Sequence, residues 1–127
     1  MNTVLVVDDS KFMRQQIKDV FSSMKTYSCI EAENGTDAIR AFVKYKPDIV
    51  TLDYEMPGIN GVDTAMNLLK LNTTSKMIII TSIKSNLVAQ KVSKIPQLGY
   101  LTKPVDPQMI QQTLTKLEQK MKEVKRD

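Results

Sequence analysis

Five side chains suited to metal and phosphate chemistry stand at or just beyond the ends of short apolar runs in the sequence. They are Asp8, Asp9, Asp53, Thr81 and Lys103. Carboxylates that lie close together repel one another unless a cation separates them, and oxygen ligands without histidine or cysteine favour a hard ion such as Mg²⁺. A lysine and a hydroxyl group can bind the oxygens of a phosphoryl group. The set therefore predicts phosphate chemistry with a carboxylate as the nucleophile.

The apolar runs themselves are predicted to be β-strands. Most are short, continuously apolar and rich in valine and isoleucine, as expected for strands buried on both faces of a sheet. Five such runs follow one another along the chain: Val4–Val7, Tyr27–Ala32, Asp48–Leu52, Met77–Ile80 and Gly99–Thr102.

Amphipathic stretches between and after the runs predict five helices. Ser10 is the expected N-cap of the first helix. The last helix has Asp106 as its expected N-cap and Pro107 at its first position. The helices between them are expected after the Asn34–Gly35 turn, at Val62–Leu71 and at about Asn86–Lys94.

The apolar positions of the first and last helices predict the faces that pack on the sheet. In the last helix the spacing also fits a coiled-coil seam, but packing on the sheet is the favoured interpretation, although the stripe extends beyond what such a sheet would cover. The two sets are Phe12, Met13, Ile17, Val20, Phe21 and Met24, and Ile110, Leu114, Leu117, Met121 and Val124.

Alternation of strands and helices with short connections predicts a doubly wound α/β fold, a parallel five-stranded sheet with helices on both faces. Ligands of such sheets bind beyond the carboxyl ends of the strands, which is where all five chemically suited side chains are expected. Taken singly, each has an ordinary alternative role, such as helix capping by Asp8 and Asp9. Their joint position favours a functional site.

Four segments around these side chains form a characteristic pattern: VLVVDDSKFMR at 4–14, PDIVTLDYEMPGINGVD at 47–63, MIIITS at 77–82 and GYLTKPVD at 99–106. They resemble the receiver domains of response regulators, most closely the chemotaxis type, CheY. The resemblance covers essentially the whole chain, so residues 1–127 are expected to form one receiver domain. It implies a flavodoxin-like sheet of order 2-1-3-4-5.

The resemblance implies how a metal and a phosphoryl group would be bound. Asp53 matches the phosphoacceptor, which is phosphorylated with the help of Mg²⁺. Asp9 matches the direct metal ligand and Asp8 its partner. Asp53 and the backbone carbonyl of Glu55 would complete the protein's share of the metal ligands.

The resemblance also implies a switch. Lys103 and Thr81 match the lysine and the hydroxyl that bind the phosphoryl group, so they belong with Asp53 to the catalytic set. As Thr81 moves towards the phosphoryl group it would vacate space that Tyr100, the aromatic switch position, can fill. Pro104 follows Lys103, and in the family this peptide bond is commonly cis.

A signalling role follows from the same resemblance. The domain would receive its phosphoryl group from a sensor histidine kinase and would not be an enzyme beyond catalysing its own phosphorylation and dephosphorylation. Its fourth helix, fifth strand and fifth helix would then dock on a downstream partner, such as the flagellar motor switch or another effector, or on a second copy in a homodimer. Since the chain has no histidine, it cannot pass phosphate through a histidine of its own.

Three other functions are considered. The chain could be a receiver excised from a longer regulator with a DNA-binding or methylesterase output domain. A small aspartyl-phosphate phosphohydrolase of the haloacid-dehalogenase kind is less favoured, because it needs an Asp-x-Asp pair where this chain has Asp8, Asp9 and Ser10. A flavodoxin-like cofactor protein is least favoured, since the loop after the first strand lacks a hydroxyl-rich phosphate cradle.

Composition limits the broad class of the protein. With 127 residues, of which 42% are hydrophobic, the chain has room for one domain with a single core. The lone cysteine, Cys29, fits a reducing compartment and predicts a cytoplasmic protein. The first residues match neither a signal peptide nor a membrane span. The net charge of +4 is dispersed, so nucleic-acid binding is not expected, and the charged C-terminal run is expected to be a solvated helix face.

Overall fold

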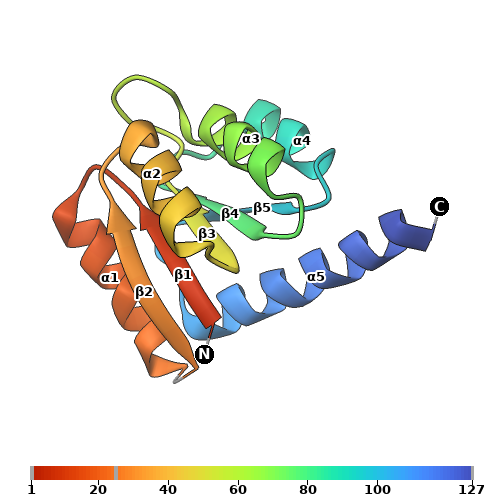
Figure 1. Ribbon diagram of the computed structural model, residues 1–127, viewed down its shortest axis with the longest axis horizontal. Helices are drawn as coiled ribbons and strands as arrows, with labels where there is room; N and C mark the ends of the chain where they lie inside the picture. The colour runs from red at the N-terminus through yellow and green to blue at the C-terminus, as the bar shows by residue number, and fades with distance from the viewer. Residues whose placement is uncertain (1, 25, 127) are drawn as a thin grey trace.

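Strands and helices alternate from one end of the chain to the other in the computed structural model, which describes residues 2–24 and 26–126 (Figure 1). The expected order of elements is confirmed, and the predicted bounds agree with the observed ones to within two residues. The elements are β1 (Asn2–Val7), α1 (Lys11–Ser23), β2 (Tyr27–Ala32), α2 (Gly35–Tyr45), β3 (Ile49–Leu52), α3 (Gly61–Leu71), β4 (Lys76–Thr81), α4 (Asn86–Ser93), β5 (Leu98–Thr102) and α5 (Pro107–Arg126).

The five strands form one parallel sheet in the order β2-β1-β3-β4-β5. This is the predicted doubly wound order, in which the chain reverses direction across the sheet after β2. The strands β1 and β3 lie in the middle, and all four residues of β3 are buried. The carboxyl ends of β1 and β3 therefore meet at the centre of one sheet edge.

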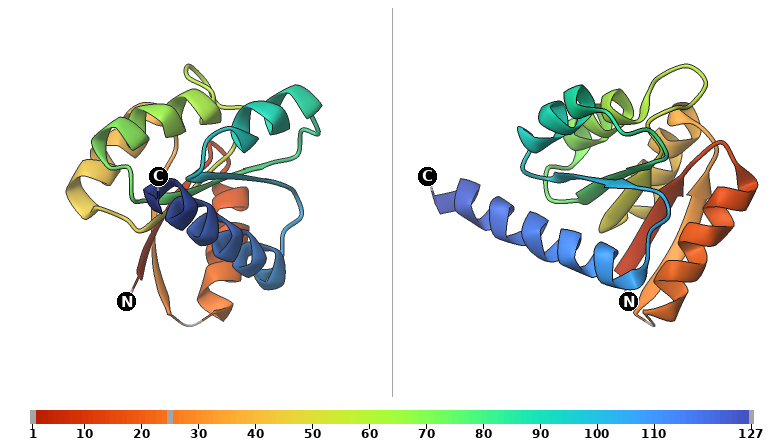
Figure 2. Two further views of the ribbon diagram at one scale, coloured as in Figure 1. Left: turned by 90° about the vertical axis from the view of Figure 1, so that its right-hand side faces the viewer. Right: turned by 180° about the vertical axis from the view of Figure 1, so that it is seen from behind.

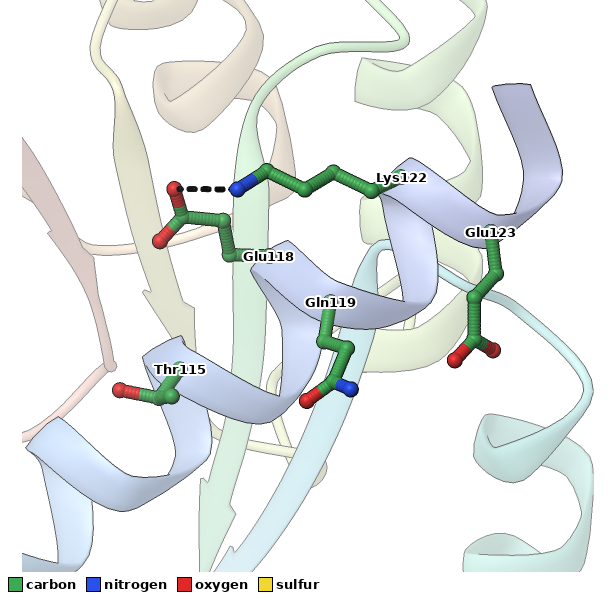
Figure 3. Close-up of a pocket in the computed structure, with 5 residues that line it drawn as sticks. All are labelled: Thr115, Glu118, Gln119, Lys122 and Glu123. Atoms are coloured by element: carbon green, nitrogen blue, oxygen red, sulfur yellow. Dashed lines mark ion pairs between the residues drawn. The ribbon is translucent and has the colours of Figure 1, made fainter. Parts of the chain in front are cut away.

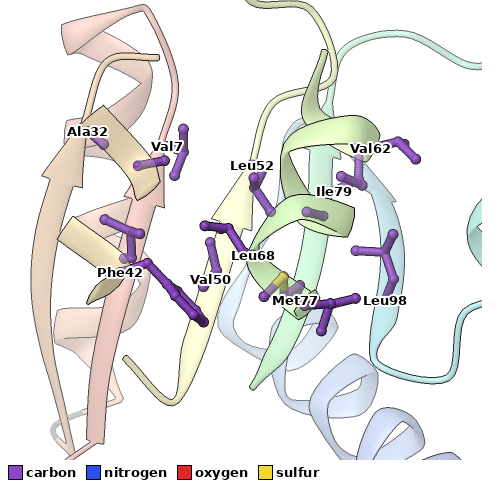
Figure 4. Packing of buried hydrophobic residues seen from close by; sticks show 14 of the residues in the cluster. Val7, Ala32, Phe42, Val50, Leu52, Val62, Leu68, Met77, Ile79 and Leu98 are labelled. Atoms are coloured by element: carbon purple, nitrogen blue, oxygen red, sulfur yellow. The ribbon is translucent and has the colours of Figure 1, made fainter. Parts of the chain in front are cut away.

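Two apolar clusters hold the helices against the sheet. Helices α2, α3 and α4 cover one face, where Val50, Leu52 and Ile79 of the sheet belong to one cluster with Phe42, Leu68 and other helix residues (Figure 4). Helices α1 and α5 cover the other face, as Figure 2 shows. Alternate residues of each strand face opposite ways, so every inner strand contributes to both clusters.

Side-chain caps fix where the helices begin. The hydroxyl of Ser10 accepts from the backbone N–H of Met13 at 3.2 Å, and the carboxylate of Asp106 accepts from that of Met109 at 2.8 Å. Both N-caps were predicted from the sequence. Asp8 and Asp9 lie between the end of β1 and the Ser10 cap.

Helix α5 extends beyond the edge of the sheet on which it packs (Figure 1). Its residues Ile110, Leu114 and Leu117 are buried, whereas Val124, near its end, is 55% exposed. The apolar stripe was predicted to pack on the sheet, and this is confirmed for its first three positions. None of the helices in the described part of the chain is both long and apolar enough to span a membrane.

Candidate functional site

Backbone hydrogen bonds continue the sheet one residue beyond several strands and place the chemically suited side chains. The N–H of Asp8 donates to the carbonyl of Ala32 at 3.1 Å, that of Asp53 to Val7 at 3.0 Å, and that of Lys103 to Thr81 at 2.9 Å. Asp8, Asp53 and Lys103 are therefore held by the ladder itself. The predicted gathering of these residues at one sheet edge is what the structure shows.

Three carboxylates meet at this edge. Asp8, Asp9 and Asp53 each offer an oxygen, and these oxygens all lie within 4.8 Å of one another. Asp8 is buried, Asp53 is half-buried and Asp9 is exposed, so the group opens to solvent on the side of Asp9. We name Asp8, Asp9 and Asp53 the acidic cluster.

Lys103 is the cation that faces the acidic cluster. Its Nζ lies 3.0 Å from Oδ2 of Asp8 and 3.6 Å from Oδ2 of Asp53. Three carboxylates against one ammonium leave a formal excess of two negative charges, which a divalent cation would neutralise. The donors are all oxygen, as a hard ion such as Mg²⁺ prefers. The residues present therefore fit the expected metal.

Glu55 lies next to the acidic cluster, on a shallow open hollow. The hollow is lined by Asp9, Tyr54, Glu55, Met56, Pro57 and Asn60, and the side chain of Glu55 is exposed. The structure thus brings the β3–α3 loop and Asp9 together, as the assignment of Glu55 requires.

Gly61 allows helix α3 to approach the acidic cluster. Its N–H donates to the carbonyl of Tyr54 at 2.8 Å, and a Cβ at this position would lie 2.2 Å from the carbonyl oxygen of Asp53. Only glycine permits so close an approach. Gly61 was not predicted to take part in the site, although a glycine at the first position of a helix is a recognisable signal.

Thr81, the last residue of β4, and Tyr100 of β5 are joined through the β4–α4 loop. The buried hydroxyl of Thr81 accepts from the N–H of Ile83 at 3.3 Å. The hydroxyl of Tyr100 donates to the carbonyl of the same Ile83 and accepts from the N–H of Ser85 at 3.3 Å. Ser85 in turn caps helix α4 by accepting from Val88 at 3.2 Å. The half-buried Tyr100 is thus already bound to the loop that Thr81 begins.

One further expected feature is a cis peptide bond, and one hollow lies apart from the site residues. The Lys103–Pro104 peptide bond is cis, as the resemblance implied. The hollow in Figure 3 is formed by α5 alone, from Thr115 to Glu123, and contains none of the site residues. Its ion pair between Glu118 and Lys122 spans 3.8 Å and is exposed, so it stabilises the protein little. In the charged run, Lys116, Glu118, Lys122 and Glu123 are exposed, as the prediction of a solvated helix face requires, whereas the side chains of Lys125 and Arg126 lie outside the described residues.

Comparisons with known proteins agree with this architecture. The family model of the response regulator receiver domain matches residues 4–115. The chemotaxis protein CheY of Thermotoga maritima is 32% identical over 114 residues, which are 90% of this chain and 95% of that protein. The protein-glutamate methylesterase/protein-glutamine glutaminase of the same organism is 33% identical over 104 residues, which are 80% of this chain but only 30% of that enzyme.

A solved structure supports the same assignment. In the complex of CheX, CheY, BeF₃ and Mg²⁺ from Borrelia burgdorferi, a chain superposes on this one with a TM-score of 0.78 at 26% identity, covering 89% of this chain and 86% of that one. With a family match over most of its length and the same five-stranded architecture, the chain belongs to the receiver domains of two-component response regulators and is of the CheY-like kind.

Proposed function

We propose that this chain is a phosphoryl-accepting receiver, in which Asp53 takes a phosphoryl group from a sensor histidine kinase. The observation that carries the proposal is the meeting of Asp8, Asp9 and Asp53 within 4.8 Å, with Lys103 at 3.0 and 3.6 Å from two of them. We assign Asp53 as the acceptor because it follows the central strand β3 and lies near both the other two acids and Lys103.

Charge neutralisation is what makes Asp53 an adequate nucleophile. A carboxylate and a phosphoryl group repel each other, so attack on phosphorus requires opposite charge on both sides. Asp8, Asp9, Asp53 and the carbonyl of Glu55 would hold Mg²⁺, which when bound neutralises negative charge on the cluster and on the phosphoryl oxygens.

Phosphoryl transfer then forms one bond and breaks another. A carboxylate oxygen of Asp53 bonds to phosphorus while the bond from phosphorus to the donor's nitrogen breaks, and the product is an acyl phosphate. Lys103 moves away from Asp8 and binds a phosphoryl oxygen. The hydroxyl of Thr81 donates a hydrogen bond to another phosphoryl oxygen. The chain catalyses these steps and its own dephosphorylation but acts on no separate substrate.

The contacts of Thr81 and Tyr100 provide a mechanism for a switch. The hydroxyl of Thr81 accepts from the N–H of Ile83 at 3.3 Å, so a movement of Thr81 towards a phosphoryl oxygen would pull on or break this contact. Ile83 also accepts from Tyr100, whose hydroxyl binds Ser85, the N-cap of α4. A shift at Thr81 therefore reaches the start of helix α4 through one loop and one tyrosine. Tyr100 would respond as part of this loop rather than as an independent rotor.

The switched face would be formed by α4, β5 and α5. On it Leu87 is 80% exposed, and Lys84, Lys91 and Lys94 lie on or beside α4. This combination suits an acidic, partly apolar partner, and we favour partner docking over a homodimer. The match to 95% of a CheY supports the proposal that residues 1–127 form a single receiver domain, which acts in chemotaxis in the cytoplasm. The second candidate function is that of the receiver domain of a protein-glutamate methylesterase.

The proposal is tested with a small-molecule phosphoryl donor. The chain incubated with acetyl phosphate and Mg²⁺ should gain one phosphoryl group, seen by intact mass, whereas Asp53→Asn should gain none. Titration with Mg²⁺ alone should raise the melting temperature by mass action, and Asp9→Asn should weaken that response. A phosphorylated Asp53→Asn variant would refute the assignment of the acceptor.

The switch is tested separately. Amide shifts on adding beryllofluoride should extend from the acidic cluster to Ser85 and the first turn of α4, and Thr81→Ala should confine them to the metal-binding loops. A Thr81→Ala variant with the wild-type pattern would contradict the coupling but leave the acceptor assignment intact.

A further inference from the structure

Arg14, a buried cation of helix α1, contacts the peptide that carries the acidic cluster. Its Nη1 donates to the backbone carbonyl of Asp8 at 2.7 Å, and its Nε donates to Oε1 of Glu31 at 3.0 Å. The residue is 7% exposed, so these bonds replace contacts with water that burial removes. One guanidinium group therefore joins the β1–α1 loop to strand β2.

Glu31 in turn holds the guanidinium group of Arg14. Its second oxygen, Oε2, accepts from Nζ of Lys18 at 3.1 Å, so both carboxylate oxygens are in use. Partial burial raises the pKa of Glu31, but hydrogen bonds from Lys18 and Arg14 outweigh this effect and hold that pKa below its ordinary value. Glu31 is therefore an anion at neutral pH and neutralises the buried charge of Arg14.

Each polar group of Asp8 makes a hydrogen bond, and the bond to its backbone carbonyl comes from Arg14. Its N–H binds Ala32, and its carboxylate accepts from the N–H of Ser10 at 2.9 Å and from Lys103 at 3.0 Å. The remaining group, its carbonyl, belongs to the peptide that leads into Asp9. The bond from Arg14 therefore sets the orientation of that peptide and with it the path of the chain at Asp9.

We infer that Arg14 is a positioning residue of the acidic cluster: by binding the Asp8 carbonyl and Glu31 together, it holds Asp8 and Asp9 where they share a divalent cation with Asp53. The inference rests on the proposed function, since it concerns the same site. Nε and Nη1 of Arg14 are directed to β2 and to a backbone carbonyl, so Arg14 would act on a bound cation through the Asp8 peptide and not as a ligand.

Charge and positioning predict opposite effects when Arg14 is replaced. A positive charge near the cluster repels a cation, so removal of the charge alone would strengthen Mg²⁺ binding. Loss of the bond to the Asp8 peptide would instead weaken it, because residues that orient metal ligands typically contribute tenfold or more to metal affinity. The sign of the change therefore identifies the role.

The experiment is a calorimetric Mg²⁺ titration of the full chain and three variants, each shown by urea unfolding without metal to be folded. We expect Arg14→Met to weaken binding about tenfold and Arg14→Lys to restore only part of it, because an ammonium group lacks the planar fork that serves both partners. The control Lys18→Met removes a cation that binds the same Glu31 but not the Asp8 peptide, and it should leave the affinity unchanged.

Each result decides between the alternatives. A folded Arg14→Met variant that binds Mg²⁺ as tightly as wild type, or more tightly, overturns the inference while the proposed function stands. Should Arg14→Met not fold, Glu31→Gln serves instead: it should weaken binding more than Lys18→Met does, and equal affinities of these two variants overturn the inference. A wild-type chain that does not bind Mg²⁺ overturns both this inference and the proposed metal site.

Discussion

Replacement of Gly61 by alanine should disturb the phosphoacceptor directly. The added Cβ would lie 2.2 Å from the carbonyl oxygen of Asp53 and 2.9 Å from its carbonyl carbon, whereas ordinary contacts begin at 3.4 Å. Both atoms are backbone, so relief requires helix α3 or the peptide after Asp53 to move by about 1 Å. Such overpacking costs roughly 1–3 kcal/mol of stability, and a displacement of this size at reacting groups slows a reaction on the order of a hundredfold.

Gly58 provides the matched control in the same loop. It has φ of +84° and nothing within 4 Å of an added Cβ. Gly58→Ala should therefore lower the free energy of unfolding only through its left-handed backbone conformation, by roughly 1–2 kcal/mol. Urea unfolding should show comparable losses of stability for the two variants. Phosphorylation by acetyl phosphate, followed by intact mass, should be much slower for Gly61→Ala alone. Equal rates for both variants would refute the argument that Gly61 places Asp53.

Three further predictions concern groups that are not members of the acidic cluster. Thr51→Val should raise the free energy of unfolding by about 1 kcal/mol, because the buried Oγ1 has no hydrogen-bond partner among the described residues; a loss of that size in urea unfolding would contradict this. The pKa of Glu31 lies below its ordinary value of 4.5 through Lys18 and Arg14, despite burial that raises it. The stability lost in Glu31→Gln should therefore be constant above about pH 5 and shrink as acid protonates the native carboxylate; a loss that does not change with pH in the acid range would argue against the pairing. Burial raises the pKa of the Cys29 thiol, so iodoacetamide should alkylate it more slowly at neutral pH in the folded chain than in urea, and equal rates would show that it is not protected.

The sheet and the acidic cluster could be predicted because both depend on local patterns. Short Val/Ile-rich runs specify parallel strands, and in a doubly wound sheet the residue after each strand falls at one edge. The proximity of Asp8, Asp53 and Lys103 could therefore be predicted from their positions in the sequence alone. The roles of these residues came from the resemblance to receiver domains and stay predictions until they are tested.

Packing between elements distant in the sequence was harder to predict. Phe12 was counted with the apolar face of the first helix, but it is 69% exposed, because it lies beside that face while Ile17 and Phe21 fill it. Arg14 was missed although it occurs three residues before Ile17 on the buried side. A charged residue in an apolar stripe was the available signal, but its partner, Glu31, lies on a different element that the helical pattern does not reveal.

The most direct test of the central claim identifies the residue that carries the phosphoryl group. The chain is phosphorylated with acetyl phosphate and Mg²⁺, reduced with borohydride, which converts an aspartyl phosphate to homoserine, and sequenced as peptides by mass spectrometry. We predict homoserine at position 53 and unmodified aspartate at positions 8 and 9. Homoserine at either of those positions, or none in a chain that is otherwise folded and binds Mg²⁺, would contradict the assignment of Asp53 as the phosphoacceptor.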